Sequence, residues 1–144
     1  MLNNKWYKFL IYFALWAMAF INIAIGIIFI SGTHYKLLSL TKNVVYSYYL
    51  DLQKVDKFLG YVHILISIYI INVFYNLFGL KKGSLNMLLA MHVIIIFFRV
   101  LYFIVCPLNL QAFKLYNILS LIINILLIIF NYCYLRKCRQ TFIN

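Results

Sequence analysis

FLIYFALWAMAFINIAIGIIFI, residues 9–30, decides the fold of this chain. None of its side chains is charged, and Asn22 is its only amide. A helix needs about 20 apolar residues to cross the roughly 30 Å hydrocarbon core of a bilayer. The run therefore predicts a membrane-spanning helix, because a helix satisfies its own backbone hydrogen bonds where no water is available.

Three further runs have the same character and occupy residues 58–78, 85–105 and 113–135. Turn-forming residues such as Gly79 and Pro107 separate them. The runs are continuously apolar rather than alternating, which argues against β-strands. The sequence thus predicts an all-α membrane protein, a single domain over 1–144 built as a bundle of four transmembrane helices.

The composition agrees with lipid as the solvent. Hydrophobic residues make up 67% of the chain and charged residues 10%, against about 45–50% and about 25% in soluble domains. A soluble chain of 144 residues has too little polar surface to cover so much apolar area. The net charge of +11 then indicates contact with anionic lipid headgroups rather than with nucleic acid.

The distribution of Lys and Arg predicts the orientation, because cytoplasmic segments carry the excess of these residues. Seven flank the runs on one side: Lys5, Lys8, Lys81, Lys82, Arg136, Lys137 and Arg139. Five flank them on the other: Lys36, Lys42, Lys54, Lys57 and Lys114. We therefore expect a multi-pass protein of the cell membrane with both termini in the cytoplasm.

The segment 31–57 is the only long connection between the runs, and it is predicted to lie outside. Its residues Leu40, Val44, Tyr48 and Leu52 recur every four positions. This spacing is typical of an amphipathic helix, so we expect a short helix lying on the outer membrane surface. A ligand-binding role for this loop is the alternative.

Polar side chains at depth in a membrane are the informative ones. Six of them form a candidate intramembrane cluster: Asn22, His63, Ser67, Arg99, Ser120 and Asn124. At 1.5 Å rise per residue most lie in one slab, about 7.5–12 Å below the outer helix ends, with Asn124 nearer the midplane. We expect them to face inward, either joining helices by hydrogen bonds or lining a ligand site.

Arg99 is the exceptional member, because an unpaired charge at depth costs at least about 2.5–3.5 kcal/mol. Three interpretations remain open. Its long side chain reaches up to the interface, or it forms an ion pair with Asp56 near the outer start of the second run, or it binds an anionic lipid or substrate.

The sequence predicts no metal, cofactor or catalytic residue. His63 and His92 differ in depth by about 12 Å, which is too far for one metal ion. The cysteines at 106, 133 and 138 form no C-x-x-C pair. Cys133 and Cys138, at the end of the last run, are either ordinary thiols or sites of lipidation. The chain has no Glu and no paired carboxylates, so we do not expect an enzyme.

The basic amino end, the stretch INIAIGIIFISG (21–32), the four runs and the exit YLRK (134–137) resemble small uncharacterised four-span membrane proteins of AT-rich Gram-positive bacteria. The resemblance covers the layout of the whole chain and implies no activity or site.

We therefore expect an accessory, scaffold or regulatory subunit in the membrane. Its partners would be the lipid bilayer and another membrane protein or a second copy of itself, and not nucleic acid. The alternative is a small transporter, or a lipid- or anion-binding membrane protein that uses a polar pocket around Arg99.

Overall fold

The computed structural model describes residues 5–106 and 114–136, except for the side chains at 37 and 134–136. The elements are α1 (Lys5–Phe9), the π-helical η1 (Leu10–Ala14), α2 (Leu15–Ser31), the 3-10 helix η2 (Thr33–Leu38), α3 (Lys42–Tyr48), α4 (Leu52–Phe78), α5 (Ser84–Val105) and α6 (Lys114–Arg136). The first three continue into one another as a helix of 27 residues, Lys5–Ser31, here called the N-terminal helix.

In the described part of the chain four helices are long and apolar enough to cross a membrane: Lys5–Ser31, Leu52–Phe78, Ser84–Val105 and the part of α6 over Lys114–Cys133. The prediction of four such helices is confirmed to this extent. The first two helices begin earlier than the predicted starts at 9 and 58, because the helices continue into charged residues that the apolar runs excluded. Phe113, the predicted start of the fourth run, lies outside the described residues.

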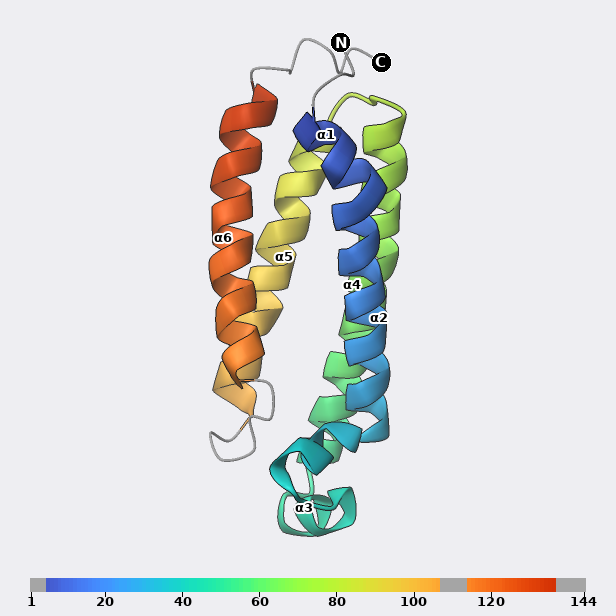
Figure 1. Cartoon of the computed structure of the whole chain (residues 1–144). Coiled ribbons are helices and arrows are strands. Elements are labelled where there is room, and N and C mark those ends of the chain that lie inside the picture. The colour runs from blue at the N-terminus through green and yellow to red at the C-terminus, as the bar shows by residue number, and fades with distance from the viewer. Residues whose placement is uncertain (1–4, 107–113, 137–144) are drawn as a thin grey trace.

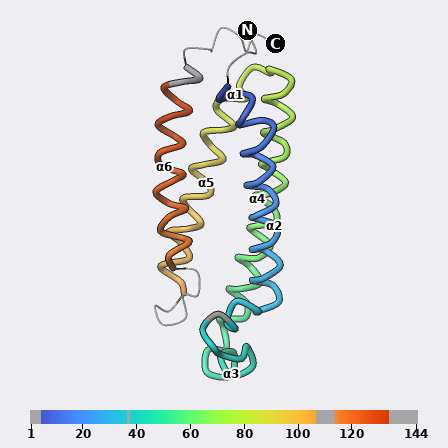
Figure 2. The backbone as a smooth tube through the Cα atoms, in the orientation of Figure 1, coloured from blue at the N-terminus to red at the C-terminus, as the bar shows by residue number. Residues whose placement is uncertain are grey.

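The four long helices run antiparallel to their chain neighbours (Figure 1). The start of α1, the end of α6 and the turn between α4 and α5 lie at one end, here called the terminal end, while η2 and α3 lie at the opposite, loop end. The backbone trace shows the same arrangement (Figure 2). The most extensive packing joins α2 to α4, and α5 then connects this pair to α6.

The close approach of α2 and α4 depends on two glycines that face each other. A Cβ added to Gly26 would lie 2.8 Å from the carbonyl oxygen of Gly60. One added to Gly60 would lie 2.5 Å from Cγ1 of Ile30 and 2.8 Å from the carbonyl oxygen of Gly26. Small residues that let two backbones approach are typical of helix contacts in membranes.

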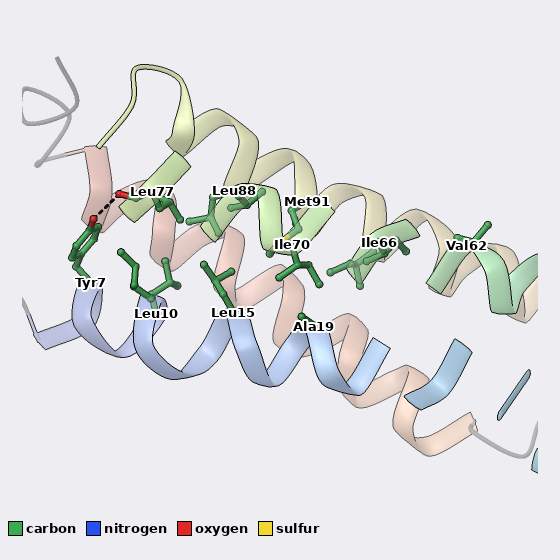
Figure 3. Close-up of a cluster of buried hydrophobic side chains, with 13 residues drawn as sticks. Tyr7, Leu10, Leu15, Ala19, Val62, Ile66, Ile70, Leu77, Leu88 and Met91 are labelled. Atoms are coloured by element: carbon green, nitrogen blue, oxygen red, sulfur yellow. Dashed lines mark hydrogen bonds between the residues drawn. The ribbon is translucent and has the colours of Figure 1, made fainter. Parts of the chain in front are cut away.

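Two apolar cores fill the bundle. The larger one, at the terminal end, joins the N-terminal helix to α4 and α5 and includes Leu15, Ile70 and Met91 (Figure 3). At its edge the hydroxyl of Tyr7 donates a hydrogen bond to the carbonyl oxygen of Leu77, 2.6 Å away. That carbonyl also accepts a hydrogen bond from the backbone N–H of Leu80 at 3.0 Å, so Tyr7 joins the N-terminal helix to the last turn of α4.

The smaller core, at the loop end, contains Ile25, Phe29, Leu59 and Tyr102 together with residues of the connecting segment. On the N-terminal helix and on α5 a buried polar residue separates the two cores: Asn22 lies between Ala19 and Ile25, and Arg99 lies between Ile95 and Tyr102. The bundle therefore contains an apolar core, a polar layer and a second apolar core.

The connecting segment differs from the predicted single amphipathic helix. It forms two short helices, η2 and α3, separated at Ser39, which has a φ of 57°. Val45 is buried, whereas Val44 and Tyr48 of the predicted stripe are exposed. Leu52 is buried as the first residue of α4. Contacts with the bundle determine which face of α3 is buried, and the four-residue spacing did not identify that face.

We predict that Gly60→Ala destabilises the protein by about 1–3 kcal/mol, the usual cost of overpacking. The added methyl group meets the backbone of α2, which cannot yield as a side-chain end can. Denaturation of the detergent-solubilised protein would measure the change. The matched control is Gly79→Ala, at an exposed glycine where the nearest atom to a new Cβ is 3.3 Å away. Equal effects at both glycines would contradict the close-approach interpretation.

Candidate functional site: a polar layer and a lateral groove

Arg99 lies at the centre of the polar layer, and the residue is only 4% exposed. Its Nη1 donates a hydrogen bond to Oδ1 of Asn117 at 2.8 Å, and its Nη2 donates one to the hydroxyl of Tyr116 at 3.1 Å. The guanidinium carbon also lies 4.8 Å from the centroid of the Tyr116 ring, within range of a cation–π interaction. Arg99 therefore links α5 to α6 through neutral partners.

The same guanidinium continues the layer toward α4 and α2. Nη1 of Arg99 lies 3.5 Å from Nε2 of His63, and Nδ1 of His63 lies 2.9 Å from Oδ1 of Asn22. The amide nitrogen of Asn22 donates to the carbonyl oxygen of Met18 at 2.8 Å, which fixes the orientation of the amide. Asn22 Oδ1 is thus an acceptor, so His63 carries its proton on Nδ1 and turns the lone pair of Nε2 toward Arg99.

Ser67 lies in the same layer but serves a different contact. Its hydroxyl donates to the carbonyl oxygen of Ala19 at 3.0 Å, and its exposed fraction is 1%. The bond joins α4 to α2 about two helical turns away from the two facing glycines. This is the helix-joining role that the sequence offered as the simpler interpretation of the cluster.

A second group of polar side chains joins α5 to α6 nearer the terminal end. Nδ1 of His92 lies 2.8 Å from Oδ1 of Asn124, whose amide nitrogen donates to the carbonyl oxygen of Ser120 at 2.7 Å. The amide nitrogen of Asn131 lies 3.4 Å from Nε2 of His92. Trp6 closes the group by donating from Nε1 to Oδ1 of Asn131 at 3.0 Å. All of these partners are neutral.

Asp56 does not meet Arg99, so the ion pair, one of the three interpretations that the sequence left open for Arg99, is not formed. One of its oxygens, Oδ2, accepts hydrogen bonds from the hydroxyls of Tyr35 at 2.7 Å and Tyr46 at 2.9 Å. Nε2 of His34 lies 3.6 Å from the same oxygen. The connecting segment folds back over α4 and supplies the partners of Asp56. These residues take the place that the ion-pair interpretation gave to Arg99.

Burial keeps the groups around Asp56 in their neutral forms. It lowers the pKa of His34 below its ordinary 6.5, although the nearby carboxylate opposes the shift. Burial raises the pKa of Tyr35, and the hydrogen bond to Asp56 adds to that rise. The pKa of Tyr46 is raised for the same two reasons, with the charge of Asp56 also contributing. Both tyrosines therefore keep the protons that they donate to Asp56.

A lateral groove runs between the N-terminal helix on one side and α5 and α6 on the other. Its volume is about 490 Å³, and its lining falls within residues 6–22, 92–99 and 116–127. Arg99, Asn22 and Tyr116 lie at one end of it, and Trp6 and Leu10 at the other. The π-helical segment η1 contributes part of the wall. Such segments interrupt α-helices frequently at functional sites.

Two buried N–H groups at the polar end of the groove have no acceptor among the described residues. They are Nε of Arg99 and Nδ2 of Asn117. Rotating the Asn117 amide would not help, because its Oδ1 already accepts from Arg99. The layer therefore has more donors than acceptors at this point, which favours a ligand that brings oxygen atoms.

Most members of the predicted cluster join one of two groups. Asn22, His63 and Arg99 form a continuous contact, and Ser120 and Asn124 join the separate group around His92. Ser67 bonds to the backbone instead. The predicted cluster lacked five contributors: Trp6, His92, Tyr116, Asn117 and Asn131. Asn117 and Asn131 continue the polar stripe of α6 at helical spacing, but no sequence signal distinguished Tyr116 or Trp6.

Within the described residues, no group of three or more His, Cys, Asp or Glu side chains could hold a metal ion. Cys133 is exposed near the end of α6, whereas Cys138 lies outside the described residues. Comparisons of the chain with protein-family models, curated protein sequences and solved structures gave no match.

We predict that Tyr35→Phe lowers the free energy of unfolding by about 1.5–3 kcal/mol, because a buried carboxylate oxygen loses a hydrogen bond from a fully buried hydroxyl. Tyr48→Phe, at a residue that is 80% exposed, is the matched control. In an Asp56→Asn background the effect of Tyr35→Phe should shrink, because the charged acceptor is gone. An unchanged effect in that background would show that the bond to Asp56 is not the cause.

Proposed function

We propose that this chain is a small membrane protein that binds an anionic ligand at Arg99, within the bundle. The observation that carries the proposal is a charge without a counter-charge. Arg99 is buried among neutral side chains, and arginine does not lose its proton in proteins. The compensating negative charge must then come from outside its immediate contacts.

The chain itself has almost no acidic group to offer. Its only two acidic side chains are Asp51 and Asp56. Asp56 is engaged by the two tyrosines of the connecting segment. Asp51 is exposed and pairs with Lys54 at 3.1 Å. The geometry therefore favours an external anion as the counter-charge. Such an anion would accept hydrogen bonds from the two N–H groups that have no acceptor among the described residues, Nε of Arg99 and Nδ2 of Asn117.

Another interpretation from the sequence is snorkelling, in which the side chain of Arg99 extends to the membrane interface. This interpretation fits the geometry less well. A snorkelling side chain carries its charge to the interface and leaves its stem against apolar surface. Arg99 instead directs its guanidinium into contacts with His63, Asn117 and Tyr116, and only 4% of the residue is exposed. It lies six residues before the end of α5, roughly 9 Å below that end.

We predict that inorganic phosphate and acetate perturb Arg99 selectively. The chain has three arginines, so arginine Nε–H signals in nuclear magnetic resonance spectra of the detergent-solubilised protein are few, and Arg99→Lys assigns the signal of Arg99. That signal should shift saturably on titration. Isothermal titration calorimetry, which does not depend on the Arg99 signal, should show that Arg99→Leu weakens binding at least about tenfold, since hydrogen bonds to a charged group contribute about 1.5–3 kcal/mol.

Lys114→Leu is the matched control for this experiment, because Lys114 is an exposed cation at the start of α6. Its removal changes the net charge equally and should leave the affinity unchanged. A wild-type Arg99 signal that does not respond to either anion would refute the proposal. Equal losses of anion affinity in Arg99→Leu and Lys114→Leu would show that the net positive charge attracts the anions nonspecifically.

An accessory or scaffold role is a second candidate, and one observation favours it. Of the four spanning helices α6 has the smallest buried share, 17% of its apolar window. The face of α6 turned away from α5 could pack against another membrane protein or a second copy. Affinity purification in mild detergent would test this through a partner recovered in fixed proportion, which Ile122→Trp on the exposed face of α6 should displace.

A further inference from the structure

We propose that the anionic ligand is a membrane amphiphile, with a carboxylate or phosphate head at Arg99 and an acyl chain lying along the lateral groove. The inference rests on the proposed function and adds the class of ligand. It starts from the uneven lining of the groove. Arg99 and Tyr116 line one end, where Nε of Arg99 and Nδ2 of the neighbouring Asn117 have no acceptor among the described residues, while the other end is walled by apolar side chains.

Polar side chains in the middle of the groove are already paired with one another. His92 is bonded to Asn124, and Asn124 to Ser120. They therefore leave little hydrogen-bonding capacity for a ligand along this stretch. A ligand that follows the groove needs polar atoms at its Arg99 end and apolar surface beyond, which is the chemistry of a fatty-acid-like or single-chain phosphate amphiphile.

The dimensions of the groove suit one acyl chain. On α6 its lining extends from Tyr116 to Leu127, roughly 16 Å at 1.5 Å per residue. Lipid chains of one leaflet span half of the hydrocarbon core, roughly 15 Å. A second apolar depression, which shares Trp6, Ile123 and Leu127 with the first, continues along α6 to Cys133. A chain longer than one leaflet therefore still finds apolar surface.

The volume of the groove suits a small ligand. The groove holds about 490 Å³, within the roughly 300–1,000 Å³ of small-molecule sites.

Such a ligand would enter the groove laterally, between the N-terminal helix and α6. The rims of the groove are exposed side chains, among them Phe13 and Ile21 on the N-terminal helix and Leu119 and Ile123 on α6. An amphiphile already dissolved in the membrane could slide in between these rims without unfolding either helix. A free inorganic ion, by contrast, would have to leave water to reach Arg99.

The test compares ligands that differ in one feature each, using the Arg99 signal of the full chain in detergent. The probes are acetate, octanoate, hexadecanoate, hexadecyl phosphate and the neutral hexadecanol. We expect affinity to rise with chain length, because each buried CH₂ can contribute up to about fourfold. Hexadecanoate and hexadecyl phosphate should bind at least about tenfold more tightly than both acetate and hexadecanol, since only they satisfy both ends of the site.

A variant that fills the groove separates this inference from the proposed function. Ala17 lines the groove, whereas Ala24 on the same helix is exposed and does not line it. Ala17→Phe should weaken hexadecanoate binding at least about tenfold and leave acetate binding unchanged. Ala24→Phe should change neither. If Ala17→Phe lowers the melting temperature, Ala17→Leu gives the same comparison with less added bulk.

Each outcome bears on one claim. If acetate and phosphate bind at Arg99 as tightly as the long-chain probes, or if the filling variants leave hexadecanoate binding intact, the ligand is a free anion and the amphiphile inference is wrong. If hexadecanol binds as tightly as hexadecanoate, the groove accepts any apolar chain and the head plays no part. If no anion perturbs Arg99, the proposed function itself fails.

Discussion

The uncompensated charge of Arg99 is the constraint on which the rest of the bundle depends. A buried cation tolerates low-dielectric surroundings only with hydrogen-bond acceptors close by. The chain provides them as neutral groups from two other helices: an amide, a phenol and an imidazole. On α5 Arg99 lies between Ile95 of the larger core and Tyr102 of the smaller one, so its position marks where one apolar core ends and the other begins on this helix.

The two halves of the bundle are held together by different interactions. On the side of α2 and α4, facing glycines bring the backbones into contact, and Ser67 bonds directly to a backbone carbonyl. On the side of α6, polar side chains of Asn117, Asn124 and Asn131 reach across to α5 and Trp6. Side-chain bridges hold helices farther apart than backbone contact does. The lateral groove lies on this second side.

The sequence was sufficient for the helices and for part of the site. Apolar length almost alone predicts helices that are long enough to cross a membrane, and depth along the helices selected Asn22, His63 and Arg99, which the structure joins. The sequence could not show which elements face each other, and the partners of Asp56 depend on this. The sequence placed Asp56 and Arg99 near the outer ends of the second and third runs. In the structure the connecting segment folds back and brings Tyr35 and Tyr46 to the carboxylate of Asp56. That fold depends on long-range packing, which four-residue spacing in the segment did not reveal.

The two buried charges of the bundle are satisfied to different degrees, and this difference points to the site. Asp56 is an acceptor, and the chain encloses it with two hydroxyl donors of its own. Arg99 has five N–H groups to place, and it receives three contacts from side chains that are not charged, with Nε left over. Asn117 adds a further donor without an acceptor. A carboxylate or phosphate supplies both the missing acceptors and the missing charge, and the apolar groove that begins at this point explains why such a group would arrive on an acyl chain.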